Sequence, residues 1–83
     1  MKTIARFKHI YIDEVAVSDS GKTSLFAVMN KSGNYPLAEI KWYGPWRQYC
    51  FFPLDGTVWN NSCLRDVLGF INRLMRERKN ERK

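Results

Sequence analysis

The sequence has little of what metal centres, disulfide scaffolds and membrane spans are built from. One histidine and two cysteines stand among 83 residues, and Cys50 and Cys63 are 13 positions apart. This separation fits neither a metal-ligand spacing nor a secreted disulfide framework, so both thiols are expected to be reduced. No stretch approaches the roughly 18 apolar residues of a membrane span, and the charges within residues 1–14 are unlike a signal peptide. We expect a cytoplasmic protein with no metal, no cofactor and no membrane partner.

Strong positive charge is also missing from most of the chain, although the net charge is +6. Residues 73–83 hold six basic and two acidic side chains and therefore supply +4 of that total, while residues 1–72 carry only +2. We expect one domain, residues 1–75, followed by a basic tail, residues 76–83, that has nothing apolar to dock and frays into water. The tail residues that could contact phosphate or an acidic partner are Arg76, Arg78, Lys79, Arg82 and Lys83.

Short strand-like runs separated by turn residues make up the first half of the chain. Residues 3–17 are rich in Ile, Val, Phe and Tyr, and an Asp-Ser-Gly-Lys turn separates them from residues 23–29. This pattern predicts a first hairpin. Residues 30–36 are rich in turn formers and predict a loop, after which a third strand spans residues 37–43.

Residues 42–52 are the most distinctive segment, because they hold six of the twelve aromatic side chains. Gly44-Pro45 fits the two central positions of a type II′ turn, which would place Trp42 opposite Arg47 in a cation–π contact. Side chains alternate across a strand, so this hairpin has two faces. The predicted core face carries Ala38, Ile40, Trp42, Arg47, Tyr49 and Phe51, and the polar face carries Glu39, Lys41, Tyr43, Trp46, Gln48 and Cys50.

A helix is predicted from about Asn61, because Asn60 is a good N-cap and apolar residues recur at helical spacing after it. The apolar stripe is Cys63, Leu64, Val67, Leu68, Phe70, Ile71, Leu74 and Met75. The predicted fold class is α+β: a four-stranded antiparallel sheet of two hairpins with one C-terminal helix packed on one face.

The motif Ile-Lys-Trp-Tyr-Gly-Pro-Trp-Arg-Gln-Tyr-Cys-Phe-Phe-Pro occupies residues 40–53, and Thr-Val-Trp-Asn and Cys-Leu-Arg-Asp-Val follow it at residues 57–60 and 63–67. Over residues 37–70 the chain resembles a group of small uncharacterised proteins encoded by phages and prophages. The resemblance implies a viral context, with the host cytoplasm as the location, and it carries no activity to particular residues.

No constellation of residues points to catalysis. Residues 20–24, Ser-Gly-Lys-Thr-Ser, imitate the end of a P-loop, but Ala16 stands where its first glycine is required, so a hairpin turn is the better interpretation. His9 is expected at the surface, and the adjacent Asp13 and Glu14 would point to opposite faces of a strand. We expect no enzyme activity and no catalytic residue.

Binding is the remaining class of function. Tyr43 and Trp46, flanked by Lys41 and Gln48, have the composition of protein-interface hot spots and of base-stacking platforms. We expect a phage interaction protein that acts stoichiometrically on a host protein or ribonucleoprotein, for example an anti-CRISPR-like inhibitor. The alternative is a DNA- or RNA-binding accessory protein of phage replication, recombination or regulation. Two plainer interpretations stay open, in which a loop or second copy covers the rings and the tail is a solvated helix end.

Overall fold

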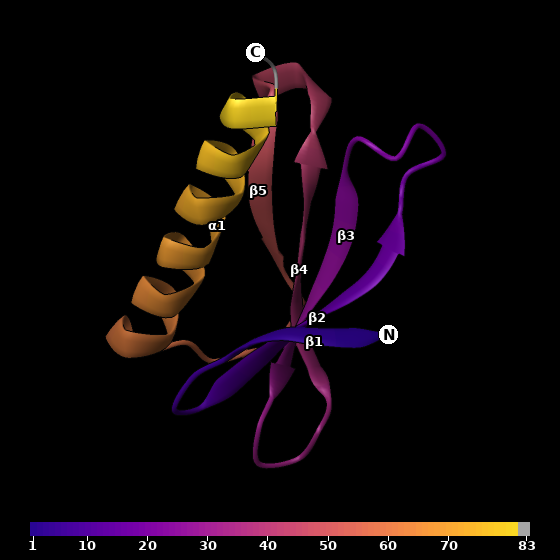
Figure 1. Ribbon diagram of the computed structural model, residues 1–83. Helices are drawn as coiled ribbons and strands as arrows, with labels where there is room; N and C mark the ends of the chain where they lie inside the picture. Colours follow the sequence, from indigo (N-terminus) through magenta and orange to yellow (C-terminus); the bar gives the residue numbers. More distant parts are fainter. Residues whose placement is uncertain (82–83) are drawn as a thin grey trace.

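The computed structural model describes the backbone of residues 1–81 and the side chains of residues 1–78. Five strands precede one long helix (Figure 1). The elements are β1 (Lys2–Arg6), β2 (Ile10–Val17), β3 (Ser24–Asn30), β4 (Pro36–Tyr43), the 3-10 turn η1 (Gly44–Trp46), β5 (Gln48–Pro53) and α1 (Asn61–Glu81). Each strand pairs antiparallel with the next, in the order β1-β2-β3-β4-β5. The predicted α+β class with a C-terminal helix is confirmed.

The predicted number of strands was wrong, because residues 3–17 form two strands instead of one. The chain reverses at Phe7–His9, a turn that contains no glycine, proline or asparagine to mark it. Long-range contacts hold this turn: the backbone N–H of Lys31 donates to the carbonyl of His9 at 3.0 Å, and Lys31 Nζ donates to the carbonyl of Phe7 at 2.8 Å. A turn supported by a residue far along the chain leaves no local sequence signal.

The predicted two-residue turn at Gly44-Pro45 was also wrong. Gly44, Pro45 and Trp46 form η1, and Arg47 follows in the left-handed region with φ 52° and donates its N–H to the carbonyl of Gly44 at 3.1 Å. The connection is therefore two residues longer at its β5 side, and Trp42 pairs with Tyr49 instead of Arg47. A shift by two residues preserves the alternation of side chains, so the two faces of β4 and β5 remain as predicted.

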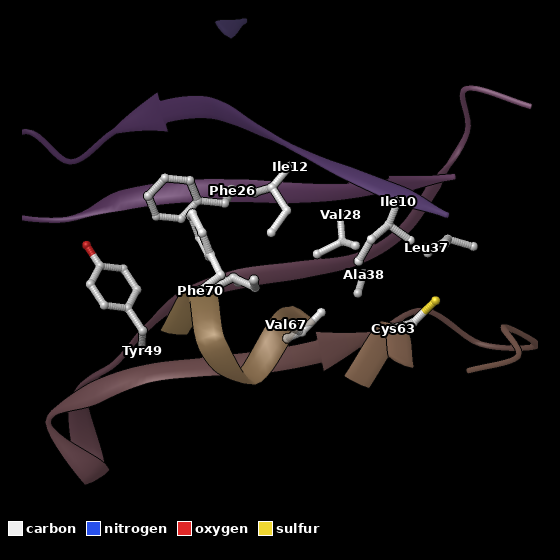
Figure 2. Packing of buried hydrophobic residues seen from close by; sticks show 11 residues of the cluster. Ile10, Ile12, Phe26, Val28, Leu37, Ala38, Tyr49, Cys63, Val67 and Phe70 are labelled. Carbon is white, nitrogen blue, oxygen red and sulfur yellow. The ribbon is translucent and has the colours of Figure 1, made fainter. Parts of the chain in front are cut away.

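The hydrophobic core joins the strands to the inner side of α1 (Figure 2). The largest of its almost fully inaccessible side chains are Ile10, Ile12, Val28 and Ile40. Phe70 of α1 meets Phe26 of β3 edge to face, with 5.2 Å between the ring centroids. The buried cluster comprises Ile10, Ile12, Phe26, Val28, Leu37, Ala38, Ile40, Tyr49, Cys63, Val67 and Phe70.

Helix α1 begins as predicted, because Asn60 Oδ1 accepts a hydrogen bond from the backbone N–H of Cys63 at 2.8 Å. The helix contacts β5, and Met75 Sδ accepts the backbone N–H of Tyr49 at 3.4 Å, on the edge of β5 that faces away from β4. Among residues 1–81, no helix is long and apolar enough to cross a membrane.

Two members of the predicted apolar stripe do not pack on the sheet. Leu64 and Leu68 are 44% and 58% exposed, whereas Val67 and Phe70 are buried. A single helix over a sheet buries a narrower arc than the eight apolar residues cover, and Leu64 and Leu68 fall outside that arc. The expectation that the whole apolar stripe faces the sheet was therefore wrong for Leu64 and Leu68.

Candidate interaction surface

The outer face of β4 and β5 is the face that points away from α1, and its side chains alternate with those of the core. Glu39, Lys41 and Tyr43 project there from β4, and Gln48, Cys50 and Phe52 project there from β5, as the register of the two strands requires. Trp46, in η1, joins them through its contact with Tyr43. We refer to these residues, without Cys50, as the aromatic patch: Glu39, Lys41, Tyr43, Trp46, Gln48 and Phe52.

Three rings of the aromatic patch meet edge to face. The Trp46 and Tyr43 ring centroids are 5.1 Å apart at an interplanar angle of 84°, and those of Tyr43 and Phe52 are 6.2 Å apart at 65°. Such contacts fix the orientation of each ring by its neighbour. Trp46 nevertheless remains 67% exposed and Tyr43 36% exposed. The rings thus form an ordered apolar surface that is open to solvent.

Lys41 is the cation of the aromatic patch, and its ammonium group already contacts an aromatic ring and a carboxylate within the patch. Lys41 Nζ lies 4.7 Å from the Phe52 ring centroid and 3.6 Å from Glu39 Oε1. Both charged side chains remain about half exposed, so the pair contributes at most ~1 kcal/mol to stability. Glu39 therefore offsets part of the positive charge beside the rings.

The structure brings together all four residues that the sequence predicted for this site. Lys41, Tyr43 and Trp46 are linked through the ring contacts, and Gln48 pairs directly with Tyr43 and is exposed. Sequence reasoning missed Phe52 as a member of the patch. Its position could have been predicted from the sequence, because the alternation of side chains that places Gln48 and Cys50 on the outer face places Phe52 there too.

The basic residues near the C-terminus do not form one exposed group. Arg78 reaches back to the sheet: its guanidinium carbon lies 4.1 Å from the Trp42 ring centroid, and its Nη1 donates to the carbonyl of Lys22 at 2.9 Å. Arg78 therefore takes the place over Trp42 that was predicted for Arg47. Arg76 is exposed, while the side chain of Lys79 and the whole of Arg82 and Lys83 lie outside the described residues.

The remaining polar candidates are occupied by structural contacts. Asp13 is buried and accepts a hydrogen bond from Thr3 Oγ1, whereas Glu14 Oε2 accepts one from Ser24 Oγ at 2.8 Å. The Ser20–Ser24 segment closes the β2–β3 hairpin, with Gly21 at φ 73°. Both cysteines are free thiols, as predicted. Among the side chains of residues 1–78, no three His, Cys, Asp or Glu side chains are grouped closely enough to hold a metal ion.

The fold and this surface define a small α+β protein built on a five-stranded antiparallel meander. The chain is 40% identical over 70 residues to the uncharacterized 9.3 kDa protein of Acholeplasma phage L2, and the match covers 83% of this chain and 90% of the phage protein. The chain therefore belongs to the family of that phage protein, which confirms the resemblance to phage proteins. No protein-family model and no solved structure matches the chain.

Proposed function

We propose that the chain is a non-enzymatic phage interaction protein that binds a host protein or ribonucleoprotein through the aromatic patch. Acting stoichiometrically, it would inhibit or redirect its target, as an anti-CRISPR-like inhibitor of a host defence system does. The observation that carries the proposal is Trp46, which is 67% exposed yet held edge to face by Tyr43. Exposed, oriented Trp and Tyr side chains are typical of the residues that dominate binding energy at protein interfaces.

The electrostatics of the aromatic patch favour a protein surface over a phosphate backbone as the partner. A base-stacking platform needs cations beside its rings to hold phosphates. Here the Lys41 charge is shared with Glu39 at 3.6 Å and with the Phe52 ring, and the carboxylate would repel a phosphate. A nearly neutral aromatic surface suits the centre of a protein interface, where charged residues are depleted.

The alternative function, DNA or RNA binding, draws its support from α1 rather than from the aromatic patch. Arg65, Arg73 and Arg76 are exposed along this helix and precede the basic residues at the C-terminus. Phosphate contacts by such residues would make the affinity fall steeply with salt concentration. This dependence separates the two functions, because an aromatic interface responds weakly to salt.

The test is affinity capture from a lysate of the phage host, performed with and without nuclease. We expect a protein partner, with or without bound RNA, recovered in a fixed molar ratio with the bait and lost when the bait carries Trp46→Ala. Leu68→Ala is the matched control, since Leu68 is a similarly exposed apolar side chain on α1, away from the aromatic patch. Recovery of nucleic acid without a protein in fixed ratio to the bait, or capture that Trp46→Ala leaves unchanged, would contradict the proposal.

A further inference from the structure

A cavity of about 470 Å³ opens at the end of the molecule where α1 begins. It lies between the β1–β2 turn, the start of the β3–β4 loop and the segment that leads into α1. In Figure 1 this is the lower end, whereas the β4–β5 connection that carries Trp46 is at the upper end, as is the last turn of α1. The volume falls within the range of small-molecule sites in proteins. Nothing in the proposed interaction function uses it.

The charged side chains that line this cavity, Lys8 and Lys31, are both basic. Lys8 and His9 come from the β1–β2 turn and Lys31 from the β3–β4 loop, and none of the described lining residues is acidic. A second cavity, of about 350 Å³ beside the C-terminal half of α1, places two carboxylates, Glu14 and Glu77, among three basic residues, Lys22, Arg73 and Arg78. Of these two cavities, the first therefore has the charge that an anion requires.

Lys31 is held in place before any ligand binds. Its Nζ donates to the carbonyl of Phe7 at 2.8 Å, and its backbone N–H donates to the carbonyl of His9 at 3.0 Å. These two bonds fix the ammonium group beside the turn that carries Lys8. A cation fixed in advance loses less conformational entropy when it binds a ligand.

The floor of the cavity is apolar. Ile10, Leu37 and Cys63 line it from the rim of the core and are between 1% and 8% exposed. His9 supplies the one aromatic ring among the described lining residues, and no Phe, Tyr or Trp side chain there offers a broad platform for a nucleobase. The ligand that suits this site has an anionic head and a small, non-aromatic body.

We propose that this cavity binds a small phosphate monoester with an aliphatic or sugar body. A phosphate monoester carries a charge of about −1.5 to −2 and three strong acceptor oxygens, so it offers Lys8 and Lys31 more charge and more acceptors than a carboxylate does. Lys8 and Lys31 hold the phosphate, and the surface of Ile10 and Leu37 covers the organic body.

Isothermal titration calorimetry of the full chain with n-butyl phosphate, inorganic phosphate and n-butanol tests the site. We expect saturable binding of one n-butyl phosphate per chain, with affinity rising about fourfold for each methylene that the floor buries. Inorganic phosphate should bind more weakly and n-butanol should not bind. Lys8→Gln and Lys31→Gln should each weaken n-butyl phosphate binding by about tenfold, because each removes one charged hydrogen-bond donor.

Lys22→Gln is the matched control, because Lys22 is an exposed lysine in the β2–β3 turn that does not line this cavity. It should leave the affinity unchanged. Lys8→Gln keeps the test valid even if Lys31→Gln loosens the β1–β2 turn, since Lys8 has no comparable structural role. Absence of saturable binding, equal losses in the control variant, equal binding of n-butanol, or equal binding of inorganic phosphate would each overturn the assignment.

Discussion

Replacing Arg78 by alanine is a strong test of how α1 is anchored to the sheet. Arg78 lies three residues beyond Met75, where the sequence predicts that the tail starts to fray. In the structure its guanidinium stacks on Trp42 at 4.1 Å and donates to the carbonyl of Lys22 at 2.9 Å. The fraying of residues 76–83 as a whole stays a prediction, and Arg78 is the residue at which it can be tested.

The expected cost of Arg78→Ala follows from these contacts. A cation–π contact contributes ~0.5–2 kcal/mol, and a hydrogen bond from a charged donor contributes ~1.5–3 kcal/mol. Arg78 Nε is buried and has no hydrogen-bond partner among the described atoms, which offsets ~1–3 kcal/mol of that gain. We therefore expect a net loss of ~1–2 kcal/mol, which in a domain of this size lowers the Tm by roughly 5–15 °C.

The assay is thermal and urea unfolding of Arg78→Ala beside Arg76→Ala. Arg76 is exposed on the same helix, so its removal deletes the same charge and should change the stability by less than ~0.5 kcal/mol. Arg78→Lys should fall between the two, since lysine retains the charge but not the planar stacking on Trp42. Equal stabilities of the two alanine variants would refute the docking of Arg78 and support a frayed tail.

Three further changes test the packing of α1. Phe70→Ala should lower the free energy of unfolding by ~3–5 kcal/mol because the ring is buried against Phe26, whereas Leu68→Ala should lower it by less than ~0.5 kcal/mol. The reverse order in urea unfolding would show that Leu68, not Phe70, faces the sheet. Asn60→Ala should cost ~1 kcal/mol through loss of the N-cap to Cys63, and an unchanged urea midpoint would speak against that cap. A thiol reagent should modify Cys50 in the native protein and Cys63 after unfolding, because Cys63 is 7% exposed; two rapidly reacting native thiols would contradict its burial.

The side chains on each face of β4 and β5 were predictable from sequence. Side chains alternate between the two faces, so an error of two residues in the pairing of the strands leaves each side chain on the same face. The expected Gly44-Pro45 turn gave the wrong partner for Trp42, yet Tyr43 and Gln48 still fell on the outer face. The true connection depends on Arg47 in the left-handed region, at φ 52°. Residues other than glycine adopt the left-handed conformation rarely, so the local sequence does not predict it at Arg47.

Features that depend on distant contacts were not predictable. The β1–β2 turn relies on Lys31, and the placement of Arg78 relies on Trp42 and the Lys22 carbonyl. Helical spacing likewise identified Val67 and Phe70 correctly but could not show that the sheet leaves Leu68 uncovered. Periodicity reports which side chains share a side of a helix, and the tertiary structure decides how wide a strip is buried.

Binding of a host protein or ribonucleoprotein by the aromatic patch is tested by the affinity of the captured partner for Trp46→Ala and for Leu68→Ala. We predict that Trp46→Ala weakens binding by about 30-fold or more, equivalent to ~2 kcal/mol, since an exposed tryptophan at an interface centre is a typical hot spot. Its Tm should stay close to that of the wild type, because the ring is 67% exposed. Equal affinities of the two variants would contradict the claim.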